Sequence, residues 1–124
     1  MKIKRIDYEF SICKVKDYSC LDLSDEFCFI GKTDEENSLV CLKEKVPKNV
    51  IKQDDGWKVL RIDEVLDFSL IGILANIADI LAKNNIGIFV ISTYNTDYVL
   101  TKSENYEKAI NALAHAGYQI ENNN

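Results

Sequence analysis

Two short segments in the second half of the sequence carry side chains that can recognise a small polar molecule. The first precedes an apolar run and contains Asp67, Ser69 and Gly72. The second follows an apolar run of β-type residues, and its polar members are Ser92, Thr93, Asn95, Thr96 and Asp97. A helix N-terminus offers unpaired N–H groups and a favourable dipole to an anion. A carboxylate accepts hydrogen bonds from an ammonium group, so the two segments together can hold a molecule that carries both charges.

Individual residues in these segments have distinct uses in such a site. Gly72 has no side chain, so a ligand can approach its backbone closely. Ser69 can cap the following helix or donate a hydrogen bond to the ligand, and Asp67 or Asp97 can accept one from an ammonium group. Phe68 and Tyr94 can supply apolar walls, because binding pockets combine such walls with a few fixed polar groups.

The same residues also have purely structural interpretations. Asp67 and Ser69 stand ahead of an apolar run, where both residue types are common helix caps. Gly72 can simply allow a helix to pack closely on a sheet. Residues 92–97 are ordinary turn formers and can form a hairpin turn without binding anything. Residue types alone leave both interpretations open.

The elements that must position these segments alternate between strand and helix patterns. Strands are predicted where β-forming residues cluster, at 57–62 with a continuation to Val65, at 86–91, at 98–100 and at 118–120. The order with the intervening helices is β-α-β-β-α-β. Two crossover helices on one face of a four-stranded antiparallel sheet make the ferredoxin-like unit, so the predicted class is α+β.

Two helices are expected in this half. The first runs from Leu70 to Lys83, with Asp79 and Lys83 as an outer i, i+4 pair and Asn84-Asn85 suited to end it. Its apolar face is predicted to comprise Leu70, Ile73, Leu74, Ile77 and Leu81. The second is expected to open at the capping-box spacing Thr101-x-x-Glu104 and to end at Gly117. Its inward side chains are predicted to be Tyr106, Ala109, Ile110 and Leu113.

The first half reads as β-rich and has no convincing amphipathic helix. A strand is predicted at 6–16, with Tyr8, Phe10, Ile12 and Lys14 on one face, and 27–30 with 39–42 form a predicted hairpin. Residues 46–51 are expected to be a connector that can include one short helical turn. Asp54-Asp55-Gly56 is a strong turn signal. We therefore expect residues 1–55 to be a shortened copy of the unit, 56–121 a complete one and 122–124 a frayed tail.

The two segments Asp67–Leu74 and Ile88–Leu100 resemble the paired-ACT family, which is related to the regulatory ends of aspartate kinases and to animal cytosolic arginine sensors. The resemblance covers about Gly56 to Gly117 and is weak over residues 1–55. It implies two ACT units packed together, an amino acid bound at an interface between units, and a regulatory rather than catalytic role.

Carried over by position, the resemblance assigns ligand contacts to a strand-to-helix loop and to the segment that faces it. The loop comprises Asp67, Phe68, Ser69, Leu70, Ile71 and Gly72. The facing segment comprises Ser92, Thr93, Tyr94, Asn95, Thr96 and Asp97. Relatives often have a proline where this chain has Lys102, which affects the start of a helix only. The family's site needs two units, so the short first half or a partner chain must supply the second.

Composition excludes several other classes of function. The net charge is -5 and the basic residues are scattered, whereas a phosphate backbone needs a concentrated basic patch, so no nucleic-acid partner is expected. No apolar run reaches the roughly 18–20 residues that span a bilayer. The basic start Met1–Arg5 leads into Ile6-Asp7 rather than a signal-peptide core, and we expect a cytoplasmic protein.

The four cysteines, Cys13, Cys20, Cys28 and Cys41, contain no C-x-x-C pair, and the single histidine, His115, is distant in sequence. We therefore expect buried reduced thiols, with no metal, no disulfide and no cofactor. No catalytic fingerprint such as H-E-x-x-H, G-x-S-x-G or a phosphate loop is present, so the chain is not expected to be an enzyme. The alternative is a dimerisation or protein-interaction module without a ligand.

The predicted strand 86–91 is apolar on both faces. Ile86, Ile88 and Val90 point to one side, and Phe89 and Ile91 point to the other. Helices are expected on one face of the sheet only, so the opposite face needs a cover from the first half, from a second subunit or from both. We expect a homodimer.

Overall fold

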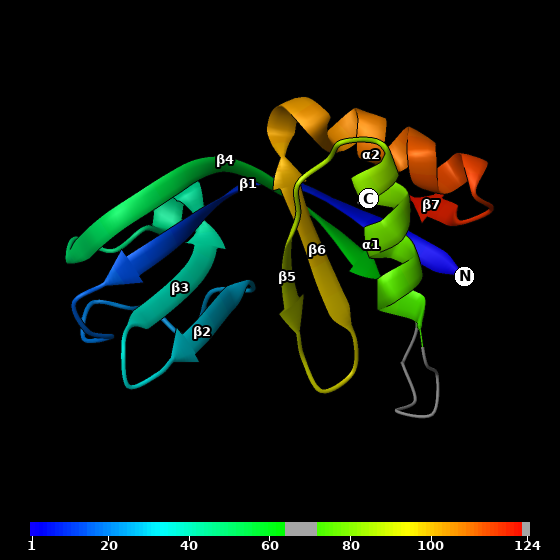
Figure 1. Ribbon diagram of the computed structural model, residues 1–124. Helices are drawn as coiled ribbons and strands as arrows, with labels where there is room; N and C mark the ends of the chain where they lie inside the picture. Colours follow the sequence, from blue (N-terminus) through cyan, green and yellow to red (C-terminus); the bar gives the residue numbers. More distant parts are fainter. Residues whose placement is uncertain (64–71, 123–124) are drawn as a thin grey trace. The chain divides into compact units, whose positions relative to one another are not determined.

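The computed structural model describes residues 1–63 and 72–122, and within these ranges the chain forms two compact units (Figure 1). Unit 1 comprises Met1–Asp7 and Lys58–Asn124, and unit 2 comprises Tyr8–Trp57. Two long strands, β1 (Lys2–Val15) and β4 (Val50–Ile62), contribute residues to both units. The residues at the amino-terminal end therefore fold with the second half of the chain.

Unit 1 has the predicted βαββαβ order. The elements that follow β4 are α1 (Ile73–Lys83), β5 (Phe89–Ser92), β6 (Asp97–Lys102), α2 (Ser103–His115) and β7 (Gln119–Glu121). The strand order is β7-β1-β4-β6-β5. The start of β1 thus lies between β4 and β7. It pairs with β7 in parallel, with Lys2 opposite Gln119. The prediction of a purely antiparallel four-stranded sheet misses this added strand.

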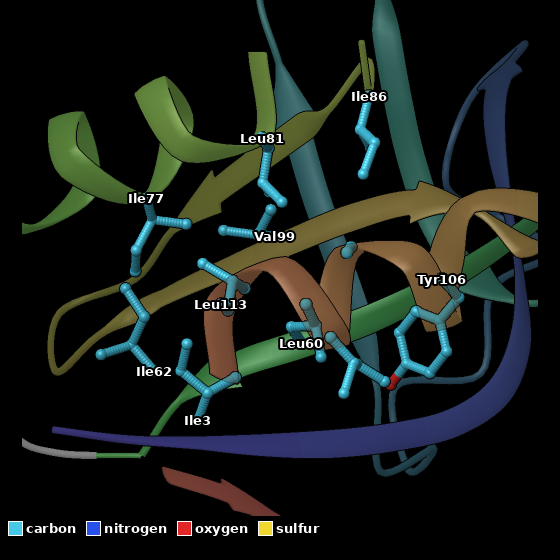
Figure 2. Close-up of a cluster of buried hydrophobic side chains, with 11 residues drawn as sticks. Ile3, Leu60, Ile62, Ile77, Leu81, Ile86, Val99, Tyr106 and Leu113 are labelled. Atoms are coloured by element: carbon cyan, nitrogen blue, oxygen red, sulfur yellow. The ribbon is translucent and has the colours of Figure 1, made fainter. Parts of the chain in front are cut away.

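Both helices of unit 1 bury their apolar faces against the same face of its sheet. The predicted inward residues of α2 are all buried, as are Ile77 and Leu81 of α1. They form one cluster with Leu60 and Ile62, which alternate along β4 and so share a face. Figure 2 shows side chains of both helices directed at these strands. On the outer face of α1, Lys83 Nζ and Asp79 Oδ2 form the predicted pair at 2.9 Å.

Helix α1 begins later than predicted. Its N-cap is Gly72, whose φ of 88° is left-handed and therefore cannot belong to a right-handed helix. The helix starts at Ile73, so the expected start at Leu70 is wrong. The predicted end is confirmed: Asn85 has φ 59°, and the Ile86 N–H donates to the Leu81 carbonyl at 3.0 Å.

Helix α2 begins without the predicted capping box. Its N-cap is Lys102, which makes no side-chain cap hydrogen bond. Thr101 is fully buried at the end of β6, and its hydroxyl donates to the Lys102 carbonyl at 3.3 Å. The burial of Thr101 in the sheet takes precedence over its capping propensity. Gly117 follows the end of the helix as predicted, and the Tyr118 N–H donates to the Leu113 carbonyl at 3.1 Å.

Unit 2 consists of strands and one turn of 3₁₀ helix in the described residues. After β1 come β2 (Cys28–Lys32), β3 (Asn37–Leu42), η1 (Lys43–Lys45) and β4. The predicted hairpin is confirmed by antiparallel pairing of β2 with β3, with Ile30 opposite Leu39. The strand order is β2-β3-β1-β4. Its core contains Cys13, Val15, Leu39 and Cys41, with Tyr18, Leu21, Cys28, Val46 and Val50 packed against it.

The predicted turn at Asp54-Asp55-Gly56 is wrong. Strand β4 runs without a break from Val50 to Ile62. Gly56 lies inside it with φ 83°, a conformation that residues with a side chain rarely adopt. The glycine therefore marks an irregularity within the strand, next to the point where the chain passes from unit 2 to unit 1 at Trp57–Lys58.

A buried tyrosine connects β1 to β4 in unit 1. The Tyr106 hydroxyl donates to the Val59 carbonyl at 2.6 Å and accepts from the Ile6 N–H at 3.2 Å. The Arg5 guanidinium and the Lys58 ammonium lie 5.4 Å and 5.5 Å from its ring centre. Helix α2 thereby fixes the two strands where they leave the unit. Burial raises the pKa of the Tyr106 hydroxyl well above its ordinary value.

The four cysteines are free thiols, and they differ in exposure. Cys13 and Cys41 are buried and Cys28 is half-buried, whereas Cys20 is exposed, so the expectation of buried thiols does not hold for Cys20. Cys20 lies between β1 and β2, outside the strands that bury the other three. Across the part of the chain that the structure describes, no helix has both the length and the apolar character needed to cross a bilayer.

Candidate functional site

A pocket of about 300 Å³ opens in unit 1 where β4 ends and where β5 turns into β6. Its lining combines charged, hydroxyl, amide and aromatic side chains: Arg61, Ile62, Asp63, Thr93, Asn95, Thr96 and Tyr98. The volume lies at the small end of the range for ligand pockets, which is about 300–1,000 Å³. The pocket can therefore take a metabolite of modest size and polar character.

Two opposite charges stand side by side in this pocket. The Arg61 Nη2 atom donates to Asp63 Oδ1 at 3.1 Å, and the two side chains are 26% and 33% exposed. Burial acts to lower the pKa of Arg61, but hydrogen bonds with Tyr98 and Asp63 outweigh it and raise that pKa. Burial acts to raise the pKa of Asp63, but contacts with Glu121 and Arg61 outweigh it and hold that pKa below its usual value. Both groups are ionised at neutral pH.

The turn between β5 and β6 is held in one shape by hydrogen bonds. The Thr93 N–H and hydroxyl donate to the Thr96 carbonyl at 2.8 Å and 2.9 Å. The Thr96 hydroxyl donates to the Ile62 carbonyl at 2.5 Å and so connects the turn to the end of β4. The Ser92 hydroxyl donates to Asp97 across the base of the turn. A pocket wall that is already ordered loses little conformational entropy when a ligand binds.

The structure brings some of the predicted site residues to this pocket. Thr93, Asn95 and Thr96 line it, while Ser92 and Asp97 pair with each other at the strand ends. Tyr94 is 86% exposed at the tip of the turn. Gly72 lies at the start of α1, outside the lining. The remaining predicted residues lie outside the described residues, namely Asp67, Phe68, Ser69, Leu70 and Ile71.

Four lining residues were not singled out from the sequence as site residues: Arg61, Ile62, Asp63 and Tyr98. The sequence does indicate the position of Arg61. Leu60 and Ile62 are apolar neighbours in an alternating strand, so Arg61 between them points to the opposite face. Asp63 follows the last residue of β4, where a strand ends and its side chains reach the sheet edge. Tyr98 was assigned only to a strand. The pairing of these residues depends on the sheet order, which sequence spacing does not give.

Metal chemistry has no support in the described residues. Among residues 1–63 and 72–122, no three histidine, cysteine, aspartate or glutamate side chains are grouped so as to hold a metal ion. Among its described lining residues, the pocket has one carboxylate and one guanidinium, and the latter is always protonated. Its chemistry is that of ion pairing and hydrogen bonding.

Comparison with known proteins identifies the family to which the chain belongs. The model of the ACT domain family matches residues 52–115, about half of the chain. A crystal structure of protein Atu0741 from Agobacterium tumefaciens is 30% identical, with a TM-score of 0.85 over 99% of this chain and 93% of that one. The chain belongs to the ACT domain family.

More distant structures share the fold. A protein of unknown function from Vibrio cholerae, described as a possible transport protein, is 21% identical with a TM-score of 0.73 over 90% of this chain and 86% of that one. The ligand-free regulatory subunit of aspartate kinase from Thermus thermophilus is 11% identical with a TM-score of 0.61 over 94% and 97% of the two chains. The predicted α+β ACT fold is confirmed, and regulatory domains of aspartate kinases share that fold.

Proposed function

We propose that this protein is a regulatory ACT-domain protein that binds a free amino acid or a similar small zwitterion. The observation that carries the proposal is the Arg61–Asp63 pair, 3.1 Å apart in a polar pocket at the end of β4. The name of the Thermus thermophilus structure, a regulatory subunit of aspartate kinase, supports a regulatory rather than an enzymatic role for the fold.

A zwitterion suits this pair better than a ligand with one charge. Arg61 and Asp63 neutralise each other, so a ligand that separates them must offer each a new opposite charge. A carboxylate can accept two parallel hydrogen bonds from the planar guanidinium, and an ammonium group can donate to the Asp63 carboxylate. A molecule with a single charge leaves one protein charge unpaired, which is costly in a partly buried site. The pair therefore favours molecules that carry both groups.

The turn residues can distinguish among zwitterions by their side chains. Thr93, Asn95 and Thr96 offer hydroxyl and amide groups in a fixed arrangement, and Tyr98 adds an aromatic surface. The predicted loop from Asp67 to Gly72 follows Asp63 closely in sequence, and its contribution to the ligand stays a prediction. We propose that the ligand sits at an interface between ACT units and that a second copy of the chain forms a homodimer.

The apolar residues of β5 give the dimer its physical basis. All four of Ile88, Phe89, Val90 and Ile91 are half-buried. Ile88 and Val90 pack against the core of unit 1, and Phe89 and Ile91 alternate with them along the strand and so point to the other face. Multi-angle light scattering of the purified full chain is expected to give twice the chain mass. A monomer mass across the full range of accessible protein concentrations would contradict the homodimer.

The ligand proposal can be tested by a thermal-shift screen against the amino acids and related metabolites. A ligand at 100 times its dissociation constant stabilises the native state by about 2.7 kcal/mol, which is a visible rise in melting temperature for a chain of this size. We expect one chemical group of zwitterions to give a shift. Esters or decarboxylated forms of the same compound, which lack one charge, are expected to give none.

Matched variants distinguish pocket binding from general stabilisation. Arg61→Gln and Asp63→Asn are each expected to remove the shift, because each leaves one ligand charge without a partner. Lys83→Gln and Asp79→Asn change an exposed ion pair on the outer face of α1 and are expected to leave it intact. A shift that survives both pocket variants would place the ligand elsewhere. No shift with any compound would favour the ligand-free dimerisation module.

A further inference from the structure

Three of the four cysteines form a row across one face of the sheet in unit 2. Cys13, Cys41 and Cys28 lie on the neighbouring strands β1, β3 and β2. Cys28 is directly opposite Cys41, and Cys41 is directly opposite Ser11 on β1. Paired residues share a face, and Cys13 is two residues from Ser11, so all three thiols point the same way.

The Cys28–Cys41 pair has the backbone geometry that a cross-strand disulfide needs. The β2–β3 hairpin closes with the Thr33 N–H donating to the Glu36 carbonyl at 2.9 Å, which makes that pair hydrogen-bonded. Hydrogen-bonded and non-hydrogen-bonded pairs alternate along the ladder, so the Cys28–Cys41 pair belongs to the second type. In such pairs the Cα atoms are about 4.5 Å apart, within the range of about 4.4–6.8 Å that disulfides span.

The exposure of the three thiols gives an order of access. Cys41 is 1% exposed and Cys13 is 4% exposed, whereas Cys28 is half-buried on β2, the edge strand of the unit. A small oxidant in solution therefore reaches Cys28 first. Cys41 is then the neighbouring thiol that faces it directly.

We propose that Cys28 and Cys41 form a thiol oxidation site that closes into a reversible cross-strand disulfide. With a low-molecular-weight disulfide as oxidant, the Cys28 thiolate attacks one sulfur of that disulfide, forms a mixed disulfide and releases one thiolate. The Cys41 thiol then loses its proton and attacks Cys28 Sγ, which releases the second thiolate. The protein loses two electrons and two protons, and the oxidant is reduced to two thiols.

Cys13 is a neighbour of Cys41 in this row but is not its disulfide partner. It lies diagonally from Cys41, because its direct partner is Leu39, and diagonal neighbours are about 7–8 Å apart, too far for an unstrained disulfide. A hydrogen bond from the Cys41 thiol lowers the pKa of Cys13, and the same hydrogen bond raises the pKa of Cys41.

The test uses the full chain, reduced and then incubated with oxidised glutathione. Intact mass spectrometry is expected to show the loss of two hydrogen atoms, and peptide mapping is expected to join Cys28 to Cys41. Cleavage after Glu26 separates Cys20 from Cys28, so the bond can be assigned without ambiguity. Cys20→Ser, at an exposed position, is the matched control and is expected to leave the disulfide unchanged.

Two further variants make the assignment specific. Cys28→Ser changes a half-buried residue and is expected to abolish the disulfide while circular dichroism shows an unchanged fold. Cys13→Ala is expected to retain the bond, because Cys13 is not the direct partner of Cys41. A bond that involves Cys20, a stable adduct that never closes in the unaltered chain, or an intact set of four thiols would each overturn the proposal.

Discussion

The two units of this chain have the same strand plan built twice. In unit 2 the neighbour order is β2-β3-β1-β4, and in unit 1 the corresponding order is β5-β6-β4-β7, with the start of β1 inserted before β7. Strands β3 (Asn37–Leu42) and β6 (Asp97–Lys102) stand sixty positions apart in sequence, and their six residues have the same pattern of burial. The order in both cases is that of a ferredoxin-like sheet.

The hairpins of the two units also close in the same way. The Thr33 N–H donates to the Glu36 carbonyl in unit 2, and the Thr93 N–H donates to the Thr96 carbonyl in unit 1. In each case the threonine hydroxyl accepts a hydrogen bond from the N–H three residues later. Strand order and turn chemistry therefore agree, and we infer that unit 2 is the shortened ACT-like half proposed from the sequence.

The units differ in what covers the sheet. After β6, unit 1 has the thirteen-residue helix α2, whereas after β3 unit 2 has only the three-residue η1. In unit 2 the side chains that pack against the core include Tyr18, Leu21 and Val46, none of which belongs to a helix or strand. Strand pairing can therefore keep the same strand order when irregular segments replace the helices. The consequence is a smaller core.

A pair of leucine-to-alanine substitutions tests this difference. Leu113 of α2 and Leu39 of β3 are both fully buried, one in each unit. We expect Leu113→Ala to cost about 3–5 kcal/mol of unfolding free energy and Leu39→Ala about 2–3 kcal/mol, because side chains from irregular segments can close over a cavity more easily than packed helices can. Urea unfolding of both variants measures these values. A larger loss for Leu39→Ala would show that the cover of unit 2 is as rigid as a helix layer.

The sequence predicted unit 1 well because its signals are local. The helical spacing of Ile73, Ile77 and Leu81 and the apolar run 86–91 each depend on residues near one another in the chain. The helix is confirmed, whereas the strand begins later than predicted, as β5 (Phe89–Ser92). The hairpin of unit 2 was predicted for the same reason. What could not be predicted was the insertion of β1 beside β7, because the pairing of Lys2 with Gln119 joins opposite ends of the chain.

The candidate site was predicted only in part, for a related reason. The turn residues Thr93, Asn95 and Thr96 are predicted from their residue types, and they line the pocket. Arg61 and Asp63 belong to a strand end that becomes part of the site only when β6 lies beside β4. The Asp54-Asp55-Gly56 sequence predicts a turn, but these residues lie inside β4. A glycine with positive φ is equally suited to an irregularity within a long strand.

Removal of one hydroxyl group tests how unit 1 holds its two long strands. Tyr106→Phe leaves the Val59 carbonyl and the Ile6 N–H without the partner that they have now. Because both backbone groups lie in the buried core, we expect a loss of about 1–3 kcal/mol of unfolding free energy, measured by urea unfolding. Unit 2 offers a comparison in Tyr18. Among the described residues, its hydroxyl forms one hydrogen bond, to the Ser38 carbonyl, and so does not join two strands as Tyr106 does.

Alkaline pH is expected to act on the same tyrosine. The pKa of Tyr106 is raised in the folded chain, so its contribution is complete below the ordinary tyrosine value of 10.0 and is lost as the pH rises above it. Above that pH the unfolded chain releases the proton first, and stability should fall by up to about 1.4 kcal/mol per pH unit. Urea titrations at increasing pH measure the slope. Tyr106→Phe should show a shallower slope, and equal slopes would contradict this account.

The smallest expected effect concerns the strand that serves both units. A side chain at Gly56 meets no atom within 4 Å, but the φ of +83° disfavours any residue with a Cβ. Gly56→Ala should therefore cost about 1–2 kcal/mol through backbone strain alone. Gly87 in unit 1 also has open space and has no positive φ, so Gly87→Ala should instead stabilise by about 0.4–1 kcal/mol. Because the two substitutions add the same methyl group, opposite signs in urea unfolding would show that the continuity of β4 depends on the conformation of Gly56, and equal effects would contradict it.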